Sequence, residues 1–168
     1  MKKVYVSWSD VEHQVQEILR QMFQDQWRPD YVVGITRGGL VPANLISQYT
    51  GCKMETLHVQ LRDGGESGCE SNLWMAEDAY NGKNILVVDD INDSGATINW
   101  IMQDWPSGCH PSDAHWQENV WNNNVRIAVL VDNQASQSQL PVNYSAMEID
   151  KSAEPQWIEF PWEEWWKH

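Results

Sequence analysis

Basic residues are scarce in this sequence, and the scarcity limits which partners it can bind. Eleven lysines and arginines stand against 24 aspartates and glutamates, which leaves a formal net charge of -13. Binding to nucleic acid depends on a basic surface, so this charge argues against nucleic acid as a partner. An anionic ligand must therefore be held by local backbone N–H groups, a few arginines or a metal ion.

Long apolar runs and closely spaced cysteines are also missing. No run of about 18 apolar residues occurs, so the sequence predicts no membrane-spanning segment. The first residues, MKKVYVSW, lack the apolar stretch and cleavage site of a signal peptide. The three cysteines, Cys52, Cys69 and Cys109, lie far apart and are expected to be free thiols, not zinc ligands. We therefore expect a cytoplasmic protein without a membrane partner, whose 168 residues suit one domain.

Apolar strands alternate with amphipathic helices along the chain. Strands are expected over 4–8, 30–36, 54–61, 84–89, 125–131 and, at a sheet edge, 142–149; helices are expected over 10–25, 40–49 and 96–105. Ser9 and Glu12 have the spacing of a capping box that opens the first helix. The alternation predicts an α/β fold, with a mostly parallel sheet flanked by helices.

Three segments show no clear periodicity of apolar residues. Residues 62–72 are rich in Gly, Ser and charge and are expected to form a mobile loop. Residues 106–124 are expected to be an irregular excursion with a short helical piece, and the tail from Glu154 onward is aromatic and acidic.

The strongest functional signal is the segment 87–97, which reads VVDDINDSGAT. An apolar strand ends in two carboxylates, Asp89 and Asp90, and a hydroxyl-rich loop then opens a helix. Backbone N–H groups at a helix start bind phosphate well, and Gly95 lets the backbone approach a ligand closely. The paired carboxylates suit ribose hydroxyls or a Mg²⁺ ion. An ordinary capped connection between a strand and a helix is the weaker interpretation of the whole pattern.

A second loop, residues 37–39, also follows a predicted strand. In parallel α/β sheets, ligands bind beyond the carboxyl ends of the strands. We therefore expect the 37–39 loop and the 93–97 loop to lie on the same rim of the sheet.

The segment 87–97 resembles the motif with which type I phosphoribosyltransferases bind phosphoribosyl pyrophosphate (PRPP). Residues 36–42, TRGGLVP, are similar to the pyrophosphate-binding loop of the bacterial xanthine-guanine members, and residues 157–162, WIEFPW, to their base-binding segment. The resemblance covers most of the chain. It implies the type I phosphoribosyltransferase fold over 1–168, with a small C-terminal base-binding hood within 150–168.

The resemblance also implies roles for the residues of both loops. The expected reaction is a Mg²⁺-dependent transfer of 5-phosphoribose from PRPP to a nucleobase. The expected PRPP-binding residues are Arg37, Gly38, Gly39, Asp89, Asp90, Asp93, Ser94, Gly95, Ala96 and Thr97. Asp89 and Asp90 would also meet the metal ion, and Asp93 would accept the proton that leaves the purine near N7. A cis peptide bond is implied between Thr36 and Arg37.

The base is the least determined part of the site. The resemblance implies that Trp157 stacks on the base and that Ile158 presents backbone groups to its edge, whereas the alternative for Trp157 is a place in the core. Purine members carry a lysine at the end of the strand that matches 125–131, but here that position falls on Asp132, or on Asn133 if the alignment slips by one. An ionised Asp132 only accepts hydrogen bonds and would prefer an amine, whereas Asn133 would tolerate a 6-oxo group.

Three functions remain open at this point. The first is purine salvage, the second is the same chemistry on another base, and the third is a non-catalytic regulator that senses PRPP or a nucleotide. The presence of Asp93 and Arg37 favours turnover. Eleven tryptophans, together with the resemblance, predict a homodimer or homotetramer. Arg62 either adds a pyrophosphate contact or is a solvated loop arginine.

Overall fold

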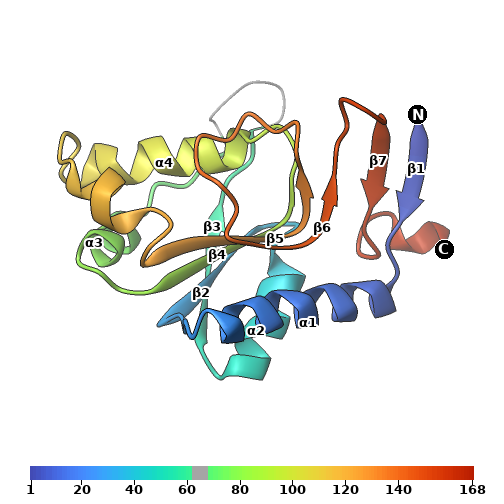
Figure 1. Ribbon diagram of the computed structural model, residues 1–168, viewed down its shortest axis with the longest axis horizontal. Helices are drawn as coiled ribbons and strands as arrows, with labels where there is room; N and C mark the ends of the chain where they lie inside the picture. Colours follow the sequence, from blue (N-terminus) through green and yellow to red (C-terminus); the bar gives the residue numbers. More distant parts are fainter. Residues whose placement is uncertain (62–67) are drawn as a thin grey trace.

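A five-stranded sheet forms the centre of the computed structural model, which describes residues 1–61 and 68–168 (Figure 1). Its strands are β2 (Tyr31–Thr36), β3 (Lys53–His58), β4 (Ile85–Asn92), β5 (Val125–Asn133) and β6 (Tyr144–Ile149). They are arranged in the order β3-β2-β4-β5-β6, and each neighbouring pair is parallel. The predicted α/β fold is therefore confirmed, and so is the edge position of the strand near 142–149.

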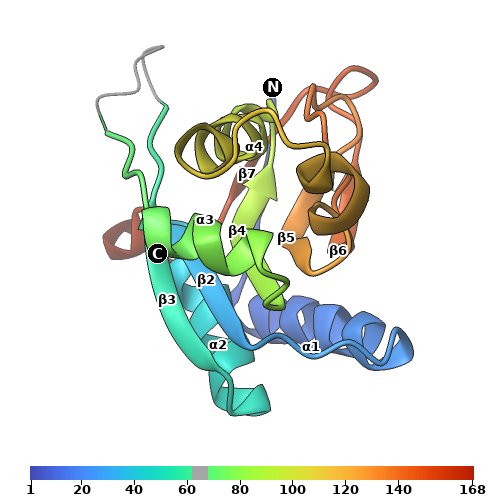
Figure 2. The ribbon, with the colours of Figure 1, turned by 90° about the vertical axis from the view of Figure 1, so that its left-hand side faces the viewer.

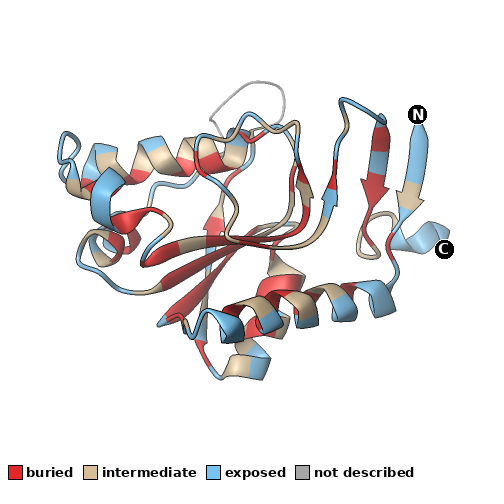
Figure 3. Cartoon of the chain, viewed as in Figure 1, coloured by how far each residue is buried: buried red, intermediate tan, exposed pale blue. Residues whose placement is uncertain are grey.

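Helices cover both faces of this sheet (Figures 1 and 2). On one face lie α1 (Trp8–Gln24) and α2 (Leu40–Thr50), and on the other lie α3 (Leu73–Tyr80), α4 (Ala96–Gly108) and a π-helical turn, η2 (Trp116–Val120). The central strands β2, β4 and β5 are largely buried between these helices, as the red ribbons of Figure 3 show. Two apolar cores result, one on each face, which explains why these strands read as nearly continuous apolar runs.

The first helix begins earlier than the sequence predicted. Ser7, not Ser9, is the N-cap residue: the backbone N–H of Asp10 donates to Ser7 Oγ at 3.0 Å, and the backbone N–H of Ser7 donates to Asp10 Oδ2 at 2.9 Å. The capping box predicted from Ser9 and Glu12 is therefore wrong, and the cap lies two residues earlier in the chain. The strand expected over 4–8 is therefore wrong in its bounds, and β1 spans Lys2–Tyr5.

Two further differences concern helices. The sequence left α3 unassigned because an eight-residue helix with three buried side chains is too short to show a clear period. Asn72 caps this helix, accepting a hydrogen bond from the N–H of Met75 at 3.1 Å. The helix α4 passes Pro106 and ends at Gly108, so it takes the first part of the segment that we expected to be irregular.

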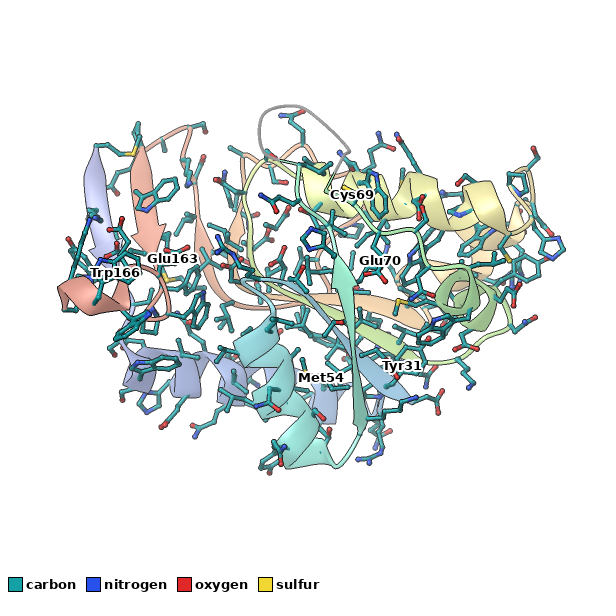
Figure 4. The ribbon with its side chains drawn as sticks, turned by 180° about the vertical axis from the view of Figure 1, so that it is seen from behind. Tyr31, Met54, Cys69, Glu70, Glu163 and Trp166 are labelled. Carbon is teal, nitrogen blue, oxygen red and sulfur yellow. The ribbon has the colours of Figure 1, made fainter. Side chains whose placement is uncertain are left out.

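The two chain ends form a small sheet of their own. β1 pairs in parallel with β7 (Gln156–Glu159), and a 3₁₀ turn, η3 (Trp165–Lys167), follows. We call the segment formed by β1, β7 and η3 the hood. It lies beyond β6, and Figure 4 shows Glu163 and Trp166 in this part of the molecule, far from Tyr31 at the start of β2. The buried side chains of Ile158 and Phe160 connect the hood to the core beneath α1.

Among the described residues, no helix combines the length and the apolar character that crossing a bilayer requires. Cys52, Cys69 and Cys109 are free thiols, as predicted.

Candidate active site

Two loops meet at the carboxyl ends of β2 and β4. Gly38, in the loop after β2, lies against the carboxylate of Asp90, and a Cβ added to this glycine would be 2.1 Å from Asp90 Oδ2. Gly39 lies against the backbone of β4, where an added Cβ would be 2.2 Å from the carbonyl oxygen of Val88. Neither position has room for a side chain, so the glycines allow the close contact. The prediction that both loops share one rim is confirmed.

The loop after β2 begins with the implied cis bond. The peptide bond between Thr36 and Arg37 is cis, and Thr36 Oγ1 lies 2.6 Å from Nδ1 of His58 on β3. The side chain of Arg37 is exposed, so its guanidinium group is accessible to an anionic ligand. Arg62 lies outside the described residues. Glu70 lies beside the end of β3, and its carboxylate accepts a hydrogen bond from the N–H of His58 at 3.1 Å (Figure 4).

Two adjacent carboxylates lie near the end of β4. The N–H of Asp90 donates to Asp89 Oδ1, and the N–H of Ile91 donates to Asp90 Oδ1, each at 2.8 Å. Burial, followed by the charge of Asp90, raises the pKa of Asp89 well above its usual range. The carboxylate of Asp90 lies against the Gly38 loop, and Asp89, whose side chain interacts with that of Asp90, lines a pocket beside α4. A cation held between these groups would offset their mutual repulsion.

The loop over 93–97 opens α4. Gly95 takes the left-handed conformation with a φ of 91°, and the N–H of Ala96 donates to Ser94 Oγ at 3.2 Å. Ser94 and Ala96 are exposed at the start of this 13-residue helix, where free backbone N–H groups and the positive end of the helix dipole coincide. These features suit a phosphate group. The pocket beside the loop continues inward along an apolar lining that includes Ile35, Val87, Ile127, Val129 and Leu140.

Asp93 is joined to a lysine to which the sequence analysis assigned no role. The ammonium group of Lys151 lies 2.9 Å from Asp93 Oδ1 and 3.0 Å from Asp93 Oδ2. The same ammonium group lies 5.8 Å from the centre of the Trp157 ring, and Trp157 is 49% exposed. The sequence could not reveal this grouping, because Lys151 is 58 positions from Asp93 and lies in the turn after β6.

Asn133 holds this group together. Its Nδ2 donates to the backbone oxygen of Asp93 at 3.1 Å and to Asp93 Oδ1 at 3.2 Å. Its Oδ1 accepts from the N–H groups of Ala135 and Lys151, each at 3.1 Å. The buried amide of Asn133 therefore has protein partners for both its oxygen and its nitrogen.

Asp132 lies in a different hydrogen-bond network. Its carboxylate accepts from Asn92 Nδ2 at 2.9 Å and from Gln134 Nε2 at 3.3 Å. Asn92 is buried and also accepts from Ser136 Oγ at 3.0 Å. This network connects the end of β4 to the loop that follows β5. The assignment of Asp132 to base binding stays a prediction.

The two hood residues named by the sequence analysis differ in accessibility. Trp157 keeps an exposed ring face, whereas the side chain of Ile158 is buried in the core beneath α1. Ile158 lies opposite Val4 in the parallel pairing of β7 with β1. The position of Trp157 therefore leaves its ring accessible for stacking, and the ring lies beside the ammonium group of Lys151.

Comparison with known proteins gives one family. Residues 5–168 match the phosphoribosyl transferase domain. A xanthine-guanine phosphoribosyltransferase of Cereibacter sphaeroides is 34% identical over 114 residues, which cover 62% of this chain and 66% of that protein. One from Gluconobacter oxydans is 27% identical over 101 residues, so the chain spans between 60% and 66% of the length of these two relatives.

A solved structure shares the fold over nearly its whole length. The xanthine-guanine-hypoxanthine phosphoribosyltransferase of Helicobacter pylori superimposes with a TM-score of 0.70 at 20% identity, and the match covers 98% of this chain and 96% of that one.

Proposed function

The chain belongs to the phosphoribosyl transferase domain family, and we propose that it transfers 5-phosphoribose from PRPP to a purine base. The products would be a nucleoside monophosphate and pyrophosphate. The observation that carries this proposal is the meeting of the Arg37–Gly39 loop with the 89–97 segment on one rim, where Gly38 contacts the carboxylate of Asp90. A ligand with phosphate groups at both ends requires two such loops side by side.

Each loop has a distinct task in the proposed reaction. The start of α4, with Ser94 and Ala96 exposed, holds the 5′-phosphate, while Arg37 and the N–H groups of Gly38 and Gly39 hold the pyrophosphate. As the bond at C1 of the ribose breaks, negative charge grows on the pyrophosphate, and the guanidinium group of Arg37 stabilises it. Local groups therefore hold a polyanion on a chain whose net charge is -13.

The carboxylates of Asp89 and Asp90 fit a Mg²⁺ ion that arrives with the substrate. Within residues 1–61 and 68–168, no cluster of three or more His, Cys, Asp or Glu side chains could hold a metal. Mg²⁺ is commonly bound by one or two carboxylates together with substrate phosphates and water, which is what this pair can offer. When bound, the ion would supply positive charge that neutralises the phosphate oxygens.

Asp93 is the proposed general base. It begins the loop over 93–97, its carboxylate oxygens receive hydrogen bonds from Lys151 and Asn133, and the same Lys151 ammonium group lies 5.8 Å from the centre of the Trp157 ring. A base stacked on Trp157 would present its N7 edge to Asp93, which then accepts the departing proton. The position near both the phosphate loop and an aromatic ring supports this role.

A direct assay tests the proposal. The protein is incubated with PRPP, Mg²⁺ and a panel of guanine, xanthine, hypoxanthine, adenine and pyrimidine bases, and both nucleotide and pyrophosphate are measured. We expect equal amounts of the two products with at least one purine and none after EDTA is added. PRPP binding without product from any base would indicate a regulator, and product only from a pyrimidine would contradict the choice of purine.

A further inference from the structure

A donor for the base is missing at the strand end, where the resemblance led us to look for one. Asp132 accepts hydrogen bonds from Asn92 and Gln134, and Asn133 uses its amide to hold Asp93 and the backbone of Lys151. Neither side chain has a donor directed at the space between Asp93 and Trp157. Lys151 does, because its ammonium group lies between these two residues.

The ammonium group has capacity for a further acceptor. It carries three N–H donors, and the two oxygens of Asp93 account for two of them. The side chain of Lys151 is 20% exposed, so it is shielded from bulk water yet accessible at the site. A hydrogen bond from a charged donor in such surroundings is stronger than one between neutral groups.

The chemistry of purines fixes what this third donor would meet. In a purine, N7 and the substituent at position 6 lie on the same edge of the ring, and a 6-oxo group is an acceptor beside N7. A donor within hydrogen-bond distance of the carboxylate that serves N7 therefore lies next to the 6-substituent. The ring of Trp157, 5.8 Å from the same ammonium group, offers the surface on which such a base would stack.

We propose that Lys151, in the turn after β6, is the residue that recognises the 6-oxo group of the base. The inference rests on the proposed function and names its substrate class as the 6-oxopurines. A lysine only donates hydrogen bonds, so it selects a carbonyl over an amine. It does so from the β6–β7 turn, in place of a lysine at the end of β5. Asp132, held by Asn92, does not then set the choice of base.

Two purines that share a 2-amino group and carry either an oxo or an amino group at position 6 provide the sharpest test. Guanine and 2,6-diaminopurine are compared as substrates by kcat/KM, with wild type and with Lys151→Met. We expect wild type to prefer guanine and the variant to lose roughly 10- to 100-fold of that preference. The KM for PRPP should change little, because Asp93 is the residue of the two phosphate-binding loops to which the Lys151 side chain is hydrogen-bonded.

Lys83→Met is the matched control. Lys83 also faces an aspartate, Asp78 at 3.9 Å, but it precedes β4 and so lies at the amino end of the sheet, away from the site. The control should keep the guanine preference of wild type. If Lys151 only positions Asp93, its replacement will slow both bases equally and leave their ratio unchanged, and that result would overturn the proposal.

The remaining outcomes separate this inference from the proposed function. If the wild-type enzyme transfers phosphoribose but favours 2,6-diaminopurine, the inference is wrong and the proposed function still holds. This outcome is visible with wild type alone. If wild type transfers to no base, the function fails, and calorimetry with GMP and 2,6-diaminopurine ribonucleotide still tests recognition. Lys151→Arg keeps a charged donor and should keep most of the preference for guanine. If both Lys151→Met and Lys151→Arg lose all activity, misfolding and not the loss of the donor is the cause.

Discussion

Gly95 lies so close to Ser138 that a Cβ added to the glycine would be 2.3 Å from the backbone nitrogen of Ser138. The loop that follows β5 thus packs against the start of α4. The N–H of Gln137 donates to the carbonyl oxygen of Ser94 at 2.9 Å, which strengthens this support. The candidate phosphate loop is therefore held by a segment about 40 residues further along the chain.

The first prediction concerns Gly95→Ala, with Gly82→Ala as its control. The two glycines have nearly the same φ, 91° and 90°, but Gly82 has no atom within 4 Å of an added Cβ. Both variants should lose about 1–2 kcal/mol of unfolding free energy from the left-handed backbone. Gly95→Ala should lose a further ~1–3 kcal/mol from overpacking against Ser138. Urea unfolding measures the unfolding free energy of both variants. Equal losses would show that the backbone near Ser138 moves aside without a free-energy cost.

The second prediction concerns Ser94→Asp. This change places a carboxylate on the exposed loop where the 5′-phosphate is expected, and repulsion should weaken Mg²⁺-dependent PRPP binding at least tenfold. Ser107→Asp adds the same charge at the exposed far end of α4 and should leave binding nearly unchanged. Isothermal calorimetry measures the affinity. If Ser94→Asp binds PRPP as tightly as wild type, the phosphate lies elsewhere.

The third prediction concerns Asp93→Asn. An amide cannot accept the proton, so turnover should fall by about 10²–10⁴-fold while PRPP binding persists. The Asn side chain can still accept a hydrogen bond from Lys151, which keeps the local geometry. Asp104→Asn is the control, a partly buried position on α4 whose carboxylate accepts a hydrogen bond from Ser71. An unchanged kcat in Asp93→Asn would show that Asp93 is not the general base and only stabilises the loop.

The fourth prediction concerns the stability of the metal-free protein. The pKa of Asp89 is raised in the folded state, so its ionised form costs stability at pH values above that folded pKa. Asp89→Asn removes the charge and still accepts from the N–H of Asp90, so Tm at pH 8 in EDTA should rise. The difference should shrink as pH falls below the usual pKa of an aspartate, where the carboxyl is neutral in both states. Activity should fall, and a lower Tm at pH 8 would contradict the argument.

The fifth prediction concerns assembly. Several large apolar side chains are more than half exposed, among them Phe23, Tyr49, Trp165 and Trp166. Phe23 and Tyr49 form an edge-to-face pair with ring centres 6.2 Å apart. Exposed aromatic residues of this kind are typical of protein interfaces, so we expect a homodimer or homotetramer. Light scattering at working concentration measures the mass, and a monomer would contradict the expectation.

Much of the fold could be predicted from local sequence because its signals are local. A buried parallel strand must be apolar on both faces, so β2, β4 and β5 are visible as apolar runs. The segment 87–97 carries its carboxylates, hydroxyls and glycine within eleven residues, and the strand-then-loop order placed both loops on one rim. The cis bond before Arg37 followed from the resemblance alone.

Other features depend on contacts between distant segments, which local patterns do not encode. The choice of Ser7 over Ser9 as the helix cap depends on where β1 ends, and the short α3 becomes a helix through the core that covers it. The contact between Gly95 and Ser138 and the ion pair between Asp93 and Lys151 join segments that only folding brings together. The sequence by itself determined the five strands of the large sheet and the order that places both loops on one rim. The tertiary structure decided which lysine lies beside Asp93, because the turn after β6 returns to the rim where β4 ends.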